Sequence, residues 1–370
     1  MGRSYRGDLV GREHSDLVDA VEIADLADRP SGPVEQDRAH RPSLAHVAQI
    51  VHLFYSRDMP ASYRDEPCKT ALNRVRNMPF AWSLNPYMGC AHQCTFCYVR
   101  AFERIADRPS DSRYGASIRV KTNLVGVLRR ELARRSWQRE EVAIGTATDP
   151  YQPAEGRFRL TRGAIVALGD ARTPFYVITR GPMIVRDVDV LSSAARRAKV
   201  GVTFSIPTLD RRIWRLTEPG TAPPHQRLRA VRALVDAGLD ASVGMAPILP
   251  GLSDDPRLMA DVVRAARDAG ATSIWTNVLH LKPGTREHFL DNLARDWPEL
   301  LPKYRALYAS RAYVANDVVQ PVRRQVAALV ARYEIVDRRA HPIMPEPALI
   351  AEQLPLTAFL QAPGLAQGAR

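Results

Sequence analysis

The stretch Asn85-Pro-Tyr-Met-Gly-Cys-Ala-His-Gln-Cys-Thr-Phe-Cys-Tyr98 places Cys90, Cys94 and Cys97 within eight positions of a 370-residue chain that has four cysteines. Four cysteines are too few for a disulfide scaffold, and their clustering suggests metal or redox chemistry in a reducing compartment. A structural zinc ion takes four protein ligands, usually as two separated pairs, so C-x3-C-x2-C is a poor zinc site. An iron–sulfur cube held by three cysteines leaves one iron open to an outside ligand, which is typical of catalysis.

The residues around this loop alternate between short β-rich runs and amphipathic helical stretches, from about residue 80 to about residue 310. This alternation predicts six strand–helix units in a parallel α/β sheet with crossover helices. Turn signals such as Asp268-Ala269-Gly270 end helices just before the next strand. The expected strands are 80–86, 142–147, 175–179, 200–206, 241–247 and 273–279.

The faces of the predicted strands differ in side-chain size. In 200–206, valine, phenylalanine and isoleucine occupy one face, whereas Gly201, Thr203 and Ser205 occupy the other, and 241–246 shows the same division. A barrel packed solid with side chains needs bulky residues on its inner face. The pattern predicts that something other than side chains fills the interior. The alternative is that small residues admit large neighbours from facing strands.

The two ends of the chain differ in pattern from the middle. Residues 1–60 mix charges with prolines, so we expect a partly disordered N-terminal extension over 1–66, a barrel over 67–310 and a C-terminal extension over 311–370. The first twenty residues contain no apolar core of a signal peptide, and no apolar run approaches the ~18 residues of a membrane span. These features predict a cytoplasmic protein without a membrane partner.

The chain is strongly basic. It has 52 Lys and Arg against 40 Asp and Glu, a formal net charge of +12. This charge favours a nucleic-acid partner, with solubility as the ordinary alternative.

The cysteine spacing, with Phe96 directly before the last cysteine, resembles the radical S-adenosylmethionine (SAM) enzymes. Further stretches resemble their spore photoproduct lyase-like branch over roughly residues 68–300, and the lead-in Cys68–Arg74 resembles an actinobacterial subgroup of it. These stretches are 85–98, 145–155, 178–180, 205–210 and 246–251.

The resemblance implies a partial (β/α)6 TIM-type barrel with the cysteine loop after its first strand. It implies that Cys90, Cys94 and Cys97 hold a [4Fe–4S] cluster whose open iron binds SAM. The reduced cluster would cleave SAM to methionine and a 5′-deoxyadenosyl radical that abstracts hydrogen from a substrate. An external one-electron reductant of the flavodoxin or ferredoxin type would supply the electron.

The resemblance also assigns cofactor-binding residues. Phe96 would lie against the adenine, with shielding of the cluster as the alternative. Thr146, Thr148 and Asp149, at the end of the second strand, would bind the amino group of SAM, since hydroxyl and acidic groups suit an ammonium donor. Asp149 could instead be a helix or turn cap before Pro150.

Arg180 and Ser205 end the third and fourth strands. The arginine would pair with the SAM carboxylate, or else with Asp187 or Glu155. The serine would meet the ribose or the carboxylate, or else bond its own backbone. Tyr98, directly after the loop, would line the substrate side or carry a hydrogen atom as a catalytic residue, or simply exclude solvent.

The chain departs from the spore photoproduct lyases at one point. Those enzymes have a hydrogen-donating cysteine in the region of Gly145–Asp149, and this chain has no cysteine there or after Cys97. Thymine-dimer reversal by that route is therefore not implied. We expect an unknown substrate, with nucleic acid or nucleotide first and a peptide or small metabolite second. The alternative from another functional class is a non-catalytic iron–sulfur or zinc protein that binds nucleic acid. A zinc site would be completed by His92 or Cys68. The nucleic acid would bind through arginine pairs at 129–130, 134–135 and 211–212.

Overall fold

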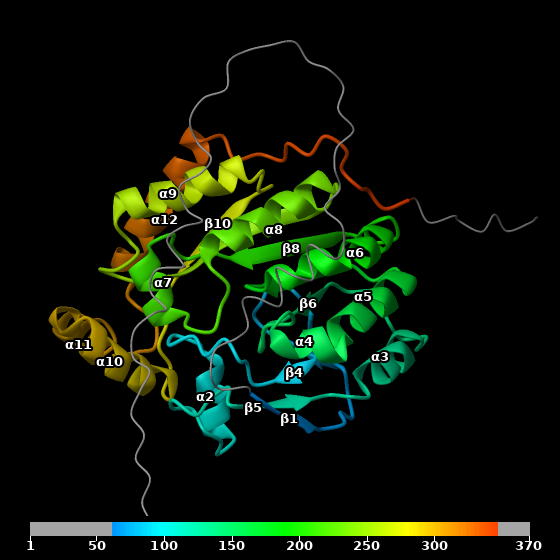
Figure 1. Cartoon of the computed structure of the whole chain (residues 1–370), viewed down its shortest axis with the longest axis horizontal. Coiled ribbons are helices and arrows are strands. Elements are labelled where there is room, and N and C mark those ends of the chain that lie inside the picture. The colour runs from blue at the N-terminus through cyan, green and yellow to red at the C-terminus, as the bar shows by residue number, and fades with distance from the viewer. Residues whose placement is uncertain (1–60, 347–370) are drawn as a thin grey trace, which may run out of the picture. The chain divides into compact units, whose positions relative to one another are not determined.

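The computed structural model describes residues 61–346, which contain a seven-stranded sheet flanked by helices (Figure 1). The strand order is β10-β9-β8-β7-β6-β3-β2, with β2 antiparallel to β3 and all other pairs parallel. The strands are β2 Leu72–Arg74, β3 Trp82–Leu84, β6 Val142–Ile144, β7 Phe175–Thr179, β8 Val200–Ser205, β9 Asp240–Ile248 and β10 Ile274–Val278. The parallel strands confirm the predicted partial (β/α)6 barrel, whose sheet ends at β10 on one side and β2 on the other.

Crossover helices connect the parallel strands and bury their apolar faces. Helix α9 shows why they form: Asp255 accepts a 2.8 Å bond from the Arg257 N–H, Pro256 starts the helix, and Val262 and Val263 are buried. The crossover helices are α3 Leu124–Leu132, α4 Pro153–Phe158, α5 Leu160–Asp170, η1 Pro182–Asp187, α6 Val188–Ala195, α7 Arg211–Thr217, α8 Pro224–Asp236 and α9 Pro256–Asp268. None of the helices described between residues 61 and 346 is long and apolar enough to cross a membrane.

A second, three-stranded sheet carries the cysteine loop. It contains β1 (Ser62–Asp65), β5 (Ser117–Val120) and β4 (Tyr87–Met88) in the order β1-β5-β4. The loop leaves β4 and continues into α2 (Val99–Ile105). The sequence pattern did not predict these strands, because runs of two to four residues are too short to show a period.

The helices after β10 contribute buried apolar side chains to the hydrophobic cores of the barrel. They are α10 Thr285–Asp296, η2 Pro298–Leu300, α11 Leu301–Leu307 and α12 Asn316–Arg332. Helix α12 packs against α9 and β10, and its Val326 is 3% exposed in the main core. The division at residues 66 and 310 stays a prediction about domains, and the disorder predicted for residues 1–60 lies outside the described residues.

The inner face of the sheet is as polar and small as the sequence predicts. Thr203 and Ser242 on neighbouring strands share a 2.8 Å hydrogen bond there. Gly244 lies beside Trp275, and a Cβ on this glycine would come within 2.8 Å of the indole ring. At this position the small residue does admit a large side chain, but from the neighbouring strand and not from a facing strand as the alternative interpretation had it.

We predict that Gly244→Ala lowers the free energy of unfolding by about 1–3 kcal/mol, because the added methyl group must displace the Trp275 ring. Urea denaturation followed by circular dichroism measures this change. Gly201→Ala is the matched control on the neighbouring strand β8. Its Cβ would meet Tyr176 at an ordinary 3.7 Å, so its stability should stay within about 0.5 kcal/mol of the wild type. Equal stabilities of the two variants would contradict the prediction.

Candidate active site

The three loop cysteines are all free thiols that lie largely out of water. Cys90 and Cys94 are each 6% exposed, and Cys97 is half-buried. Burial raises the pKa of Cys90, and nearby Asp149 and the other thiols raise it further. Burial also raises the pKa of Cys94 to about 12, although Arg180 opposes the shift. Without a metal the thiols of Cys90 and Cys94 would stay protonated at neutral pH, so a bound metal centre is the group that would make them thiolates.

The donor set fits an iron–sulfur cluster better than a single metal ion. Among residues 61–346, no three His, Cys, Asp or Glu side chains converge to hold one metal ion. Each thiolate of an iron–sulfur cube binds a different iron, so the sulfurs need not converge on one point. The backbone of the fourth cysteine, Cys68, is hydrogen-bonded to the side-chain amide of Asn123. The charged groups that act on the Cys68 thiol are Lys121, Glu131 and Arg130. This environment does not favour the zinc alternative with Cys68 as a ligand.

Arg100 of α2 fixes the backbone of the cysteine loop from one side. Its guanidinium, buried and lying over the Tyr114 ring at 4.6 Å, donates to the carbonyls of Cys94 (3.4 Å) and Gln93 (3.3 Å). The hydroxyl of Thr285, at the start of α10, donates to the Cys97 carbonyl at 3.0 Å. Buried backbone carbonyls need such donors, so these contacts set the conformation of the loop.

The end of β6 fixes the loop from the other side. The Thr148 hydroxyl donates to the Gly89 carbonyl at 2.7 Å, and the Gln152 amide donates to the same oxygen at 3.1 Å. Gln152 also accepts from the Ala91 N–H at 2.9 Å. Thr146 accepts a 3.2 Å bond from the Asn85 amide. The two threonines predicted to bind the cofactor therefore both lie against the segment that carries the cysteines.

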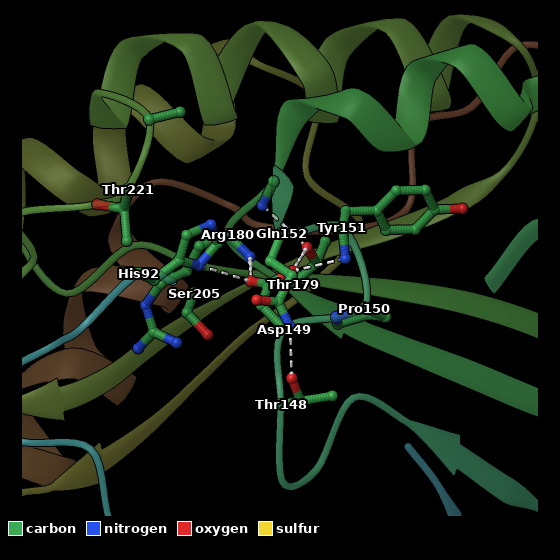
Figure 2. Close-up of polar contacts among 12 residues, drawn as sticks. His92, Thr148, Asp149, Pro150, Tyr151, Gln152, Thr179, Arg180, Ser205 and Thr221 are labelled. Atoms are coloured by element: carbon green, nitrogen blue, oxygen red, sulfur yellow. Dashed lines mark hydrogen bonds and ion pairs between the residues drawn. The ribbon is translucent and has the colours of Figure 1, made fainter. Parts of the chain in front are cut away.

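Asp149 is a buried carboxylate that accepts hydrogen bonds from its own turn and from the end of β7 (Figure 2). One carboxylate oxygen accepts from the Tyr151 N–H at 2.8 Å and the Thr179 hydroxyl at 2.7 Å. The other accepts from the Arg180 N–H at 2.6 Å and lies 3.3 Å from Nδ1 of His92. Burial would raise the pKa of Asp149, but His92 and the bonds from Thr179 and Arg180 lower it to about 2. The bond to Tyr151 is the turn cap named as the alternative.

Arg180 and Ser205 lie at the carboxyl ends of β7 and β8, as predicted. Nε of Arg180 donates to Glu218 at 2.6 Å, and its guanidinium lies 5.6 Å from the ring centre of Phe96. The carbonyl of Ser205 accepts a 2.8 Å bond from Arg227. Figure 2 shows the Arg180 backbone N–H directed at Asp149.

The ion-pair partner of Arg180 differs from both alternatives taken from the sequence. Asp187 and Glu155 pair with Arg186 instead, at 2.9 and 3.3 Å, and Asp187 also pairs with Arg162. No motif marks Glu218, which follows α7 far along the chain from Arg180.

Tyr98 belongs to an aromatic row formed by Phe102, Tyr98, His280 and Tyr313. Successive ring centres in the row are 5.9, 5.8 and 5.0 Å apart. Tyr98, Phe102 and Tyr313 are 36%, 44% and 57% exposed, and Lys282 lies 5.9 Å from the Phe102 ring centre. The row joins the cysteine loop to the segment after β10. Sequence analysis missed His280 and Tyr313, because two isolated aromatic residues give no motif.

Comparison with known proteins decides the family. The sequence model of the Radical SAM superfamily matches residues 84–263. A protein of Mycobacterium tuberculosis described as uncharacterised is 39% identical over 299 residues, which cover 80% of this chain and 88% of the relative. A protein of Methanocaldococcus jannaschii is 23% identical over 266 residues, covering 70% and 93%. The chain belongs to the radical SAM superfamily.

Solved structures show the same fold. A spore photoproduct lyase variant with bound AdoMet and dinucleoside spore photoproduct has a TM-score of 0.57 and 14% identity over 75% of this chain and 84% of the other. Another variant, with dinucleoside spore photoproduct, has a TM-score of 0.58 and 13% identity over the same shares. The protein is thus a radical SAM enzyme with a spore photoproduct lyase-like fold, and its family implies the use of SAM and an iron–sulfur cluster.

We predict that Asp149 contributes a pH-dependent part of the stability. Its pKa in the folded protein, about 2, lies below the ordinary 3.8, so the folded state binds fewer protons than the unfolded state. The contribution, about 2 kcal/mol, is complete above about pH 4 and is lost as the pH falls towards 2. Urea unfolding of the wild type and Asp149→Asn should show a stability difference that shrinks by this amount between pH 4 and pH 2. A constant difference would contradict the assignment.

Proposed function

We propose that Cys90, Cys94 and Cys97 hold a [4Fe–4S] cluster with one open iron for SAM. When bound and reduced, the cluster would cleave SAM to methionine and a 5′-deoxyadenosyl radical that takes a hydrogen atom from the substrate. The observation that carries this proposal is the three-thiol loop, held by Arg100 and Thr285 at the carboxyl ends of the parallel strands. Barrel enzymes place their reacting groups at this end.

We assign the cofactor contacts to the side chains next to the loop. Phe96 is 6% exposed and would meet the adenine, Arg180 would pair with the carboxylate, and Ser205 would meet the ribose or carboxylate. Thr146, Thr148 and Asp149 would serve the amino group. Thr148 and Asp149 would also hold neighbouring groups in position, because Thr148 bonds the Gly89 carbonyl of the cysteine loop and Asp149 bonds the Arg180 N–H.

We propose a nucleic acid or nucleotide as substrate, with Tyr98 at the reacting side. The aromatic row supports this proposal, because exposed rings beside a cation stack on planar bases. Two fold neighbours carry a dinucleoside, and the net charge of +12 agrees with a polyanion. A peptide or small metabolite with a planar ring is the second candidate.

The non-catalytic alternative, a nucleic-acid-binding protein, relies on its arginine pairs. Arg129, Arg130, Arg134 and Arg135 lie around the end of α3, which precedes the start of β6 and so lies at the amino ends of the strands. Arg211 and Arg212 begin α7, directly after the carboxyl end of β8. These pairs therefore belong to opposite ends of the barrel, which does not favour one continuous binding surface.

We further propose a cytoplasmic enzyme that receives electrons from a flavodoxin- or ferredoxin-type reductant. Residues 67–310 would form its catalytic barrel, and 1–66 and 311–370 its extensions.

The cysteine assignment predicts that Cys90→Ala, Cys94→Ala and Cys97→Ala each abolish cluster binding, because three ligands leave no redundancy. Iron and sulfide content and the electron paramagnetic resonance (EPR) spectrum of anaerobically reconstituted protein measure this. Cys68→Ala is the matched control and should bind as much iron as the wild type. Full cluster retention in Cys94→Ala would refute the assignment, whereas iron loss in Cys68→Ala would favour a four-cysteine or zinc site.

Reconstituted enzyme given dithionite and SAM should release 5′-deoxyadenosine, which a non-catalytic binding protein would not do. We predict that single-stranded oligothymidylate increases this release, and that Tyr313→Ala reduces the increase at least about five-fold because one stacking surface is lost. Ile105→Ala, an exposed residue of α2 outside the row, is the control and should behave as the wild type. Salt-sensitive binding of the oligonucleotide without any increase in turnover would favour the peptide or metabolite substrate.

A further inference from the structure

A chain of three charges, of which Glu218 and Arg227 are buried and Arg180 is half-buried, extends from the cofactor site into the body of the barrel. Glu218 is 1% exposed and accepts from Nε of Arg180 at 2.6 Å through one oxygen. Its other oxygen accepts from Arg227 of α8 at 3.0 Å. Arg227 is fully buried and also donates to the carbonyls of Ser205 at 2.8 Å and Ala222 at 2.9 Å. We call Arg180, Glu218 and Arg227 the ion chain.

Stability alone does not account for the ion chain. Moving the charges of Glu218 and Arg227 out of water is expensive, and well-packed apolar residues of similar volume are often as stable as a buried ion pair. The ion chain also lies beside Cys94, one of the proposed cluster ligands. The charges of Arg180, Glu218 and Arg227 all act on its thiol. A network of this kind at the cofactor site points to a role in positioning.

The hydrogen bonds of Arg180 to the described residues leave Nη1 of its guanidinium available to a ligand. Nε is bonded to Glu218, and Nη2 donates to the Ala246 carbonyl at 3.3 Å. From Nη1 there is no hydrogen bond to any residue within 61–346. The guanidinium lies beside Phe96 of the cysteine loop. A carboxylate that binds Arg180 would therefore meet a guanidinium whose rotation is already fixed by Glu218.

The charges of the ion chain also fit one incoming carboxylate. Two arginines and one glutamate leave a net charge of one positive unit. Without Arg227, Glu218 would neutralise Arg180 and compete with the ligand for it. Because Arg227 shares the charge of Glu218, Arg180 keeps the attraction that an anionic group needs.

We propose that Glu218 is a positioning residue that presents the Nη1 edge of Arg180 to the carboxylate of SAM, with Arg227 holding Glu218 in place. The inference rests on the proposed function, in which Arg180 binds that carboxylate. An arginine side chain is long and has many rotamers, so fixing it before the ligand arrives lowers the entropy lost on binding.

The test is a double-mutant cycle on SAM affinity, measured by anaerobic equilibrium dialysis of cluster-loaded protein. We expect Arg180→Ala to weaken SAM binding by about 10- to 150-fold, the effect of one charge-assisted hydrogen bond. Glu218→Gln should weaken it by at least about five-fold. In the Arg180→Ala background, Glu218→Gln should have less than about a two-fold further effect, because Glu218 acts only through Arg180.

Two additional variants separate positioning from folding. Glu155→Gln alters an equally buried glutamate that pairs with Arg186, and its SAM affinity should stay within about two-fold of the wild type. Glu218→Asp keeps the charge but shortens its reach, so it should keep iron content and melting temperature yet weaken SAM binding. It replaces Glu218→Gln in the cycle if that variant does not fold.

Each outcome decides the inference. Unchanged or tighter SAM binding in the Glu218 variants would overturn it, and so would a loss that is fully additive in the Arg180→Ala background. Wild-type affinity in Arg180→Ala would overturn the proposed role of Arg180 together with this inference. A normal loss in Arg180→Ala with no loss in the Glu218 variants would overturn the positioning role alone.

Discussion

The buried polar backbone of the cysteine loop needs hydrogen-bond partners, and this requirement organises the site. Arg100 bonds two loop carbonyls, Thr285 bonds the Cys97 carbonyl, and Thr148 with Gln152 bonds the Gly89 carbonyl. These donors come from α2, α10 and the segment after β6, so the loop conformation depends on contacts with all three. A loop held in this way presents its thiols with little freedom, which suits a centre bound by only three ligands.

Hydrogen bonds between strand ends bring the remaining site residues together. Asp149 bonds the Thr179 hydroxyl and the Arg180 N–H, and its other side meets His92 of the cysteine loop. One carboxylate thus connects the ends of β6 and β7 to the loop. The Tyr87 hydroxyl donates to Glu155 at 2.5 Å, so the conspicuous 145–155 stretch also supports the small sheet below the loop. The stretch therefore has residues with a structural role besides those proposed to bind the cofactor.

The edge of the large sheet at β10 lies near the proposed reacting side. Within residues 61–346, strand β10 has a strand partner on one side only, and the aromatic row lies where the segment after β10 meets the cysteine loop. Helix α12 packs on β10, and Tyr313 before it pairs with His280. The part of the chain after residue 310 therefore contributes to the surroundings of the proposed reacting side.

The sequence by itself determined the fold class, the order of the six parallel strands along the chain and the cysteine loop, because these depend on local period and spacing. It also placed Arg180 and Ser205 at strand ends, since residues that follow parallel strands gather at one edge. Only the tertiary structure decided that Arg180 pairs with Glu218, that His92 meets Asp149 and that Tyr313 stacks on His280. Each of these contacts joins segments far apart in the chain, where no local pattern marks the partner. Their geometry follows from how the strands and helices pack.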